Sequence, residues 1–543
     1  MLKRLVRTLV GPRHGTAGAA PAAVTATGFV EIAAAAQRRG ERGLARSLYL
    51  QALQADPQCA DALHLLGVLE HQERNHDDAI ELIEEAIALQ PGQADYRMNC
   101  GLAYLARGQT KEAIHMLREA LRLRPAYAKA HANLLFALNF SEDATPAEIL
   151  EAHRDAIRAS GFDRAGGATA VPAPGSERLR VGYVSGDFRE HVIALFIEPV
   201  FANHDRRTFE IFAYDGGNTA DEVNARLRKQ VDHWRLVGDL DDDGLEAMIR
   251  ADGIDILVDL AGHTRGSRLG VFARRAAPLQ LTYLGYPATV GMEQMDYRIS
   301  DPQCDPPGMT ESHYVERVAR LPDSLWCYRP PADAPEVSEL PAVANGHITF
   351  GSFNQPAKIG PKVIALWARV LQAVPGSHLL MAPVPGGFAR TRYCQEFAQH
   401  GVDEGRLEFE ARLPAAQYQG LRRRVDIALD PFPMNGGSTT CETLWMGVPL
   451  ITLTGERFSA RAGTSLLATA GLAQCIARTG DGYVEVAARM AGDLPGLAAL
   501  RAGLRGQLRH SPLMDGAGFT RDLESLLRKL WRERCAAPET AKC

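Results

Sequence analysis

The segment VDIALDPFPMNGGSTTCETLWMGVPLITLTG, residues 425–455, holds the residues whose type and spacing indicate chemistry most clearly. Its apolar start predicts a buried strand that ends at Asp430, and a loop containing Gly436 and Gly437 follows. Because glycine has no side chain, the backbone of such a loop can come close to a ligand. The spacing therefore predicts a ligand-binding loop at the end of a strand.

Ser438 and Thr439 stand where a helix is predicted to begin after this loop. The free N–H groups and partial positive charge of a helix N-terminus suit a phosphate, and the two hydroxyls add donors. Glu442 lies one turn further on, where a carboxylate can accept hydrogen bonds from a ribose diol. A plain helix cap after a glycine-rich loop accounts for the same spacing, so the pattern alone leaves both interpretations open.

His191 precedes an apolar helical segment in GDFREHVIALF. An imidazole at such a place can accept a hydroxyl proton near neutral pH. A single histidine before an apolar helix is more often a capping residue, and that interpretation stays open. Asp187, four residues earlier, is placed either to orient the imidazole or to cap the helix.

Several classes of protein are excluded by what the 543 residues lack. There is no GxGxxG after a strand, no GxxxxGK[ST], no HExxH and no GxSxG, which argues against dehydrogenase, P-loop NTPase, zinc protease and serine hydrolase. The net charge of −5 offers no overall basic field for nucleic acid, and no apolar run is long enough for a membrane span. Nine cysteines without a CxxC fit a reducing cytoplasm best. The start is basic, and its apolar stretch, cut by Arg7 and Pro12, is too short for the hydrophobic region of a signal peptide, so 1–27 is expected to be a flexible leader.

A repeat of 34 residues precedes the rest of the pattern. Proline, alanine and glycine recur at this spacing at Pro57, Pro91 and Pro125; Ala45, Ala79 and Ala113; Ala52, Ala86 and Ala120; and Gly67 and Gly101. Small residues where helices cross and proline after the second helix are typical of tetratricopeptide repeats. The repeats are predicted over 28–140, as a curved solenoid that binds polypeptide or, alternatively, only packs on the next domain.

Two series of alternating strands and helices follow the repeats. A helix capped by Thr145 and a linker rich in Gly, Ala and Pro make up 141–178. Short apolar runs separated by helical segments then predict two doubly wound α/β domains, 179–340 and 341–535, before a tail, 536–543. The strands are expected within 178–188, 210–217, 253–264 and 278–289 in the first domain, and within 347–353, 378–383, 406–411, 425–431 and 449–455 in the second. The cleft between two such domains, outside the carboxyl ends of their strands, is the expected site.

The glycine-rich loop with its Ser-Thr-Thr, Glu442 and LWMGVP resembles the donor loop of the protein O-GlcNAc transferases and the related SPINDLY proteins, which form glycosyltransferase family 41. Further blocks agree at 180–200, 255–291, 295–301 and 348–377, so the resemblance covers about 179–535. It implies a GT-B fold, in which two Rossmann-like domains face a cleft. It also implies an inverting enzyme that uses no metal and no cofactor beyond its nucleotide-sugar donor, with a polypeptide acceptor presented by the repeats.

The resemblance assigns roles residue by residue. Lys358, in NQPAKIGPK, matches the lysine that holds the donor diphosphate, and His191 matches a histidine that faces the acceptor and is a candidate catalytic base. The remaining donor-side positions are Gln355, Tyr418, Gly436, Gly437, Ser438, Thr439 and Glu442. The sugar and acceptor side is expected to include Asp187, His263, Thr264, Pro287 and Thr289, most of which follow predicted strands.

The chain departs from the O-GlcNAc transferase pattern near the nucleotide. Many such enzymes have His where this chain has Gly437, Tyr418 holds the base-stacking position, and Ala415 replaces a lysine. Some blocks lie closer to the SPINDLY branch, whose plant members are protein O-fucosyltransferases that use GDP-fucose. UDP-GlcNAc is therefore the first expectation for the donor, GDP-fucose is the alternative, and a catalytically inactive repeat scaffold is a further alternative.

The placement of these residues predicts the effect of removing the repeats. Because Lys358, His191 and Ser438 all lie beyond residue 179, donor hydrolysis is expected to survive deletion of 28–140, whereas transfer to protein falls. The alternative is that the last repeats and the helix at 145–160 form part of the catalytic core, with apolar residues such as Leu134, Leu135 and Ile149 buried there.

Overall fold

The computed structural model describes residues 25–163 and 178–536. The predicted tail after residue 536, most of the leader and most of the linker lie outside this part of the chain. The described residues form two units. The first contains the chain up to Ser141 together with Gln355–Gly360 and Val384–Tyr393, and the second contains the rest.

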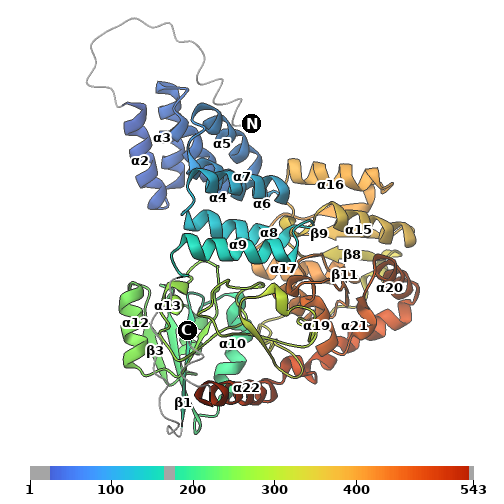
Figure 1. Ribbon diagram of the computed structural model, residues 1–543. Helices are drawn as coiled ribbons and strands as arrows, with labels where there is room; N and C mark the ends of the chain where they lie inside the picture. Colours follow the sequence, from blue (N-terminus) through green and yellow to red (C-terminus); the bar gives the residue numbers. More distant parts are fainter. Residues whose placement is uncertain (1–24, 164–177, 537–543) are drawn as a thin grey trace, which may run out of the picture. The chain divides into compact units, whose positions relative to one another are not determined.

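The first unit is a stack of antiparallel helix pairs. Its helices are α2 (Ala26–Arg38), α3 (Arg42–Ala55), α4 (Ala60–Gln72), α5 (His76–Leu89), α6 (Ala94–Ala106), α7 (Thr110–Leu123) and α8 (Ala128–Phe140) (Figure 1). A Cβ on Gly67 would lie 2.6 Å from Ile83 Cγ1, and one on Gly101 would lie 3.0 Å from Leu117 Cγ. The 34-residue repeat is therefore confirmed, with its glycines where the two helices of a pair approach most closely.

The first sheet of the second unit has seven parallel strands in the order β3-β2-β1-β4-β5-β6-β7. They are β1 (Leu179–Ser185), β2 (Phe209–Asp215), β3 (His233–Leu236), β4 (Ile256–Asp259), β5 (Leu279–Thr282), β6 (Tyr297–Ser300) and β7 (Arg317–Arg320). The central register pairs Val181 with Ile211 on one side and Ile256 on the other, and all three are fully buried. The connecting helices include α10 (Val192–Asn203), α11 (Glu222–Arg228), α12 (Asp242–Ala251) and α13 (Leu269–Ala273).

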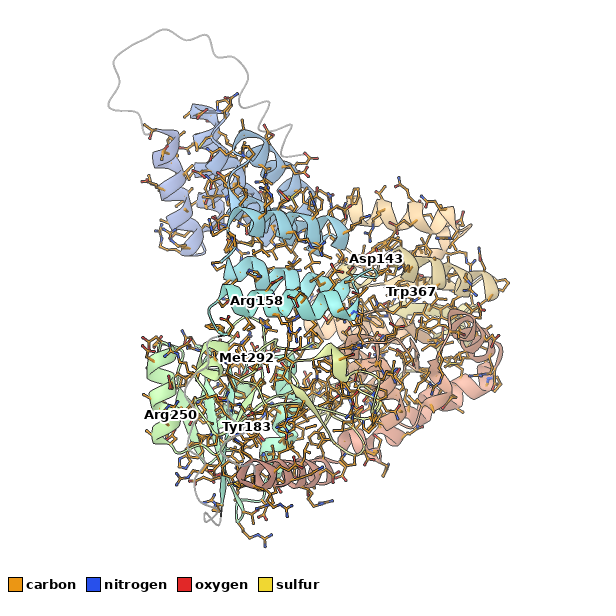
Figure 2. All side chains as sticks on the ribbon, viewed as in Figure 1. Asp143, Arg158, Tyr183, Arg250, Met292 and Trp367 are labelled. Atoms are coloured by element: carbon orange, nitrogen blue, oxygen red, sulfur yellow. The ribbon has the colours of Figure 1, made fainter. Side chains whose placement is uncertain are left out.

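The second sheet has six parallel strands in the order β10-β9-β8-β11-β12-β13. They are β8 (Thr349–Ser352), β9 (His378–Met381), β10 (Leu407–Phe409), β11 (Ile427–Leu429), β12 (Leu450–Leu453) and β13 (Ile476–Ala477). Helices α15 (Pro361–Ala373), α16 (Phe388–Gln399), α17 (Ala415–Leu421), α18 (Ser438–Trp445), α19 (Ala462–Thr469), α20 (Gly480–Gly492) and α21 (Leu494–Arg509) lie between and after them. Trp367 of α15, which belongs to the second sheet's domain, and Tyr183 of β1 in the first sheet are both fully buried. Figure 2 labels the two residues.

Both sheets have the doubly wound strand order, so the expected fold of tetratricopeptide repeats followed by two Rossmann-like domains is confirmed. In each sheet the winding reverses between two central strands, β1 and β4 in the first and β8 and β11 in the second. Ligands of such sheets bind outside the carboxyl ends of the strands at this reversal.

Helix α22 (Gly516–Ala536) crosses from one sheet to the other, and helix α9 (Pro146–Ala159) follows the repeats. The last helix, α22, follows the second sheet but packs on α10 of the first, where Glu524 Oε1 lies 3.0 Å from His204 Nδ1. Helix α9 begins at the predicted Thr145 cap, which accepts the Glu148 N–H at 3.2 Å. The predicted 341–535 domain therefore ends in a helix that covers the other sheet.

Four strands were not predicted, and their sequences explain why. β3 and β7 are the edge strands of the first sheet, and most of their side chains are partly or fully exposed. Edge strands carry charged residues rather than continuous apolar runs. Strand β6 contains the buried Arg298, and β13 has only two residues.

Candidate active site

Most of the predicted site residues follow the carboxyl ends of central strands. In the first sheet Asp187 and His191 follow β1, His263 and Thr264 follow β4, and Pro287 and Thr289 follow β5. In the second sheet Gln355 and Lys358 follow β8, and the loop with Gly436 and Gly437 follows β11. The topology thus brings these segments to the ends of the sheets where ligands of this fold bind.

His191 is the N-cap of α10, and its Nδ1 lies 3.4 Å from the Ile193 N–H that it accepts. Asp187 Oδ2 lies 3.8 Å from the same Nδ1, and Arg189 in turn donates to Asp187 Oδ1 at 3.0 Å. Burial lowers the pKa of His191, while Asp187 opposes this and Arg189 adds to it. The imidazole is therefore neutral near pH 7, and its side chain is one-third exposed, at 33%.

The two contacts at Nδ1 require different tautomers of the neutral ring. Accepting the Ile193 N–H needs a lone pair on Nδ1, which leaves the proton on Nε2. Donating to Asp187 needs the proton on Nδ1, which leaves Nε2 free to accept one. The capping role and the base role thus correspond to two tautomers of one side chain, and Asp187 favours the second.

The loop after β4 is held by Asp259, which the sequence analysis did not single out. Asp259 is buried at the end of β4 and accepts N–H bonds from Ala261 at 3.0 Å and Gly262 at 2.8 Å, and the Thr282 hydroxyl at 2.9 Å. Burial raises the pKa of Asp259 to about 6. Its bonds fix the backbone on which His263 and Thr264 stand.

His263 and Thr264 each make a bond to a backbone carbonyl. His263 Nε2 donates to the Val290 carbonyl at 2.8 Å, and the Thr264 hydroxyl donates to the Ala261 carbonyl at 2.8 Å. Both side chains are half-buried. These bonds leave the loop rigid, with the imidazole of His263 held through one of its two nitrogens.

Thr289 and Pro287 lie on the loop after β5. The Thr289 hydroxyl donates to Glu316 Oε2 at 2.7 Å and accepts the Gly291 N–H at 3.0 Å, and the residue is buried. Its hydroxyl thus ties the loop to Glu316, whereas Pro287 is half-buried. A contact of Thr289 with a sugar would have to involve its methyl group or its backbone.

The N-terminus of α18 differs from that of α15. The first N–H groups of α15 donate to the carboxylate of Glu142, at 3.1 Å from Lys362 and 3.2 Å from Val363. In the described part of the chain, no side chain accepts the backbone N–H of Ser438 or Thr439 at the start of α18. The simple capping interpretation therefore lacks its capping side chain, and this helix end can receive an anion.

The two glycines before α18, Gly436 and Gly437, differ in how much room a side chain would have at their positions. A Cβ on Gly436 would overlap the hydroxyls of Thr440 and Thr439, so this glycine is required by packing against the helix itself. A Cβ on Gly437 would meet no atom within 4 Å, but its backbone angles, φ −110° and ψ −93°, lie outside the α and β regions that other residues favour. Gly437 thus leaves open space in front of the helix N-terminus.

Two polar residues that the sequence analysis did not assign fix this loop. Asp430 accepts the Gly436 N–H at 2.7 Å and the Thr452 hydroxyl at 2.8 Å. Asn435 accepts the Gly463 N–H at 3.1 Å and donates to the Pro431 carbonyl at 2.9 Å. Each residue thus has one partner within the loop, Gly436 or Pro431, and one in a later segment, Thr452 or Gly463.

Glu442 is held by Arg422, a fully buried residue that the sequence analysis did not identify. Arg422 Nη2 donates to Glu442 Oε2 at 2.6 Å, and its Nε lies 3.3 Å from the Thr443 hydroxyl. Burial raises the pKa of Glu442, and Arg422 opposes that change. Arg422 therefore fixes the orientation of the whole Glu442 carboxylate by holding one of its two oxygens, Oε2.

Tyr418 is anchored through its hydroxyl, which lies 3.0 Å from the carbonyls of both Phe353 and Ala382. Its ring meets the Phe353 ring edge-on at 6.1 Å, and burial raises the pKa of Tyr418 to about 12. The hydroxyl therefore connects the loops after β8 and β9. Stacking on a nucleobase would use the ring and not the hydroxyl.

Gln355 and Lys358 belong to the first unit, although they follow a strand of the second. Lys358 closes the 3₁₀ turn Pro356–Lys358 and is half-buried, whereas Gln355 is exposed. The Thr110 hydroxyl of α7 donates to the Ala357 carbonyl of this turn at 3.1 Å. The sequence left open that the repeats pack on the following domain, but it did not predict a contact with this turn.

Metal-binding clusters, disulfides and membrane-spanning helices are all absent from the described residues. Among the residues that the structure describes, no group of three or more His, Cys, Asp or Glu side chains is arranged to hold a metal ion. The eight cysteines of the described ranges are free thiols. None of the helices in those ranges combines the length and apolar character needed to cross a membrane.

Comparisons with known proteins agree on one family. The model of glycosyl transferase family 41 matches residues 168–328 and 338–523, and tetratricopeptide-repeat models match 30–94 and 94–127. A Petunia hybrida protein named "Probable UDP-N-acetylglucosamine--peptide N-acetylglucosaminyltransferase SPINDLY" is 40% identical over 76% of this chain and 45% of its own length. An Arabidopsis thaliana protein with the same enzyme name and the suffix SEC is 31% identical over 67% of this chain and 38% of its own length.

A solved structure covers more of the chain. A lysine-to-methionine mutant of the Thermobaculum terrenum O-GlcNAc transferase is 37% identical, with a TM-score of 0.86 over 95% of this chain and 99% of that one. The chain spans a little under half the length of the plant relatives that it matches.

Proposed function

The chain belongs to glycosyl transferase family 41, and from this we propose that it is an inverting, metal-independent protein O-glycosyltransferase that moves a sugar to Ser or Thr of polypeptides. The observation that carries the proposal is the family match across both sheets, together with an α18 N-terminus that no described side chain caps. UDP-GlcNAc is the proposed donor, since the relatives are named for that nucleotide sugar.

In the proposed reaction the acceptor hydroxyl oxygen attacks the anomeric carbon while the bond from that carbon to the diphosphate oxygen breaks. The hydroxyl proton passes to Nε2 of His191, in the tautomer that Asp187 favours. The leaving nucleoside diphosphate gains negative charge. Lys358 and the N–H groups of Ser438 and Thr439 stabilise that charge in the absence of a metal.

The remaining residues hold the donor. Glu442, oriented by Arg422, accepts hydrogen bonds from the ribose diol, and the ring of Tyr418 packs against the nucleobase. The loop with Gly436 and Gly437 passes close to the diphosphate, and Gln355 lies beside Lys358 in sequence on the donor side. His263, Thr264 and Pro287 surround the sugar, with Thr289 supporting their loop.

GDP-fucose is the second candidate donor. The open position at Gly437 and the greater identity to a SPINDLY protein, at 40% against 31% for the SEC protein, support it. The repeats present the polypeptide acceptor, and the free cysteines fit a reducing cytoplasm.

A binding and turnover screen tests the donor and the enzyme class together. The melting temperature of the protein is measured with UDP, GDP, UDP-GlcNAc and GDP-fucose, and release of nucleoside diphosphate is followed with each donor. We expect UDP to raise the melting temperature and UDP-GlcNAc to be hydrolysed slowly. Stabilisation by GDP alone would establish the fucosyl alternative, and binding without release above background would indicate an inactive scaffold.

A further inference from the structure

The helix pairs α2–α3, α4–α5 and α6–α7 are the first, second and third repeats, and the third repeat holds the turn that carries Lys358. The Thr110 hydroxyl, at the start of α7, donates to the Ala357 carbonyl at 3.1 Å. Gly108, in the turn between α6 and α7, has φ of +84°, and a Cβ there would lie 3.0 Å from both Pro356 Cβ and the Pro356 carbonyl. The repeat and the Lys358 turn are thus in direct backbone contact.

Arg392 of α16 bridges the turn between α6 and α7 and the turn that carries Lys358. Its Nη1 donates to the Gly108 carbonyl at 2.6 Å, and its Nη2 donates to the Ile359 carbonyl at 3.3 Å. One guanidinium therefore spans the repeat turn on one side and the residue after Lys358 on the other. Its planar fork suits this, because each nitrogen is aimed at a different carbonyl.

The start of α16 is itself fixed to the repeats. The carboxylate of Asp77, from α5, accepts the Phe388 N–H at 2.9 Å and an Arg107 N–H at 3.1 Å. The Arg107 guanidinium also covers the Phe388 ring at 4.1 Å from its centroid. All these residues belong to the first unit, so Arg392 is carried on a helix end that the second and third repeats define.

From these contacts we infer that the third repeat is a structural part of the donor site, in which Thr110 and Arg392 are positioning residues for Lys358. The inference rests on the proposed function, because it takes the role of Lys358 from there. Only a short turn separates β8 from Lys358, and an ammonium that acts on a leaving diphosphate must be held closely in place. The repeat supplies that support from outside the sheet.

This inference changes one expectation from the sequence. Deletion of 28–140 removes Thr110 and the Gly108 carbonyl, so hydrolysis of the donor falls along with transfer to protein. The sequence suggested that hydrolysis survives because Lys358 lies far beyond the repeats in the chain. The contact between Thr110 and Ala357 joins residues 247 positions apart, which no local pattern shows.

Single substitutions in the full chain test the positioning role. Thr110→Val removes the donor at nearly constant volume, and Thr110→Ser restores it. Arg392→Lys keeps the charge but cannot reach both carbonyls. We expect Thr110→Val and Arg392→Lys to lower kcat for UDP-GlcNAc hydrolysis by roughly 10-fold to 100-fold with a small change in donor KM, since the loss falls on the transition state. Thr110→Ser is expected to recover most of kcat.

Thr391→Val is the matched control, because its hydroxyl bonds only the Gly387 carbonyl at the start of α16. It is expected to leave kcat unchanged. A second comparison places Thr110→Val in a Lys358→Met background, where we expect no further loss of kcat, because the turn has no ammonium left to position. Calorimetric binding of UDP gives a parallel measurement if turnover of the double variant is too low.

The outcomes separate this inference from the proposed function. Full turnover of Lys358→Met would overturn the role of Lys358 and the inference with it. Loss of turnover in Lys358→Met, together with unchanged kcat in Thr110→Val and Arg392→Lys, would overturn the inference alone. If Thr110→Val lowers kcat by the same factor in Lys358→Met as in the wild type, the substitution acts on the fold and not through Lys358. That result would overturn the inference.

Discussion

At the scale of single residues, His191 determines how the reaction should depend on pH. Burial lowers the pKa of its imidazole below the usual 6.5, and only the neutral ring can accept the acceptor proton. As pH falls through the pKa the ring becomes charged, so kcat/KM should fall on an acid limb that lies below pH 6.5. The pH profile of transfer between pH 5 and pH 8 measures this limb.

Variants of His191 and Asp187 separate the base role from the capping role. His191→Gln can still accept the Ile193 N–H through its amide oxygen, so α10 should stay folded while the acid limb disappears with most of the activity. Asp187→Asn removes the carboxylate that opposes the lowering of the pKa, and should move the limb to lower pH. An unchanged profile in His191→Gln would show that this imidazole only caps the helix.

Lys358 is expected to carry the largest single effect on turnover. Replacing it by Met removes a fixed charge from the developing anion, a loss that typically costs roughly 10²-fold to 10³-fold in rate. Its half-buried place at the end of a turn predicts an intact fold, which circular dichroism checks. Near wild-type turnover in a folded Lys358→Met protein would contradict the assignment.

At the scale of elements, the N-terminus of α18 allows a test of anion binding that separates charge from size. Gly437→Asp would place a carboxylate in the open space before the helix. Binding of UDP should be lost, because the carboxylate lies close to the N–H groups that would receive the phosphate.

Gly437→Asn is the control, since its side chain has nearly the same size without the charge. It is expected to bind UDP much better than Gly437→Asp does, and calorimetry of both proteins gives the comparison. Equal affinity of the two variants would show that the N-terminus of α18 is not where the diphosphate binds.

The elements also show where reasoning from the sequence succeeds. Buried central strands such as β1 and β4 give continuous apolar runs, and the 34-residue spacing gives the repeats directly, so both were predicted. Edge strands β3 and β7 were missed because solvent reaches their side chains. The supports of the site depend on partners that only folding brings together: Arg422 bonds Glu442, and Asp430 accepts the hydroxyl of Thr452.

At the scale of the whole molecule, the account needs no metal ion. A fixed ammonium and a helix N-terminus take the place of a divalent cation on the leaving diphosphate. Transfer should therefore be unchanged in excess EDTA, measured after exhaustive dialysis against the chelator. Activity that is lost in EDTA and restored by Mn²⁺ or Mg²⁺ would contradict the mechanism.

Two segments, Gln355–Gly360 and Val384–Tyr393, follow strands of the second unit in the chain but pack with the repeats of the first unit. They contain the turn with Lys358 and the start of α16, which follow strands β8 and β9. The division of the chain into repeats followed by a catalytic part is therefore incomplete as a description of function. Substitutions at Thr110 or Arg392 should report on the donor, although Thr110 lies in the repeats and Arg392 lies within α16 rather than in the loop directly after β9.

Transfer of sugar to polypeptide is the decisive measurement for the proposed function. The full chain is incubated with UDP-GlcNAc, and separately with GDP-fucose, together with a mixture of unstructured peptides that contain Ser and Thr, and the peptides are sequenced by mass spectrometry. The account predicts one N-acetylhexosamine on Ser or Thr with the wild type, matching release of UDP, and none with Lys358→Met. Nucleotide binding by the wild type without any sugar on Ser or Thr from either donor would contradict it.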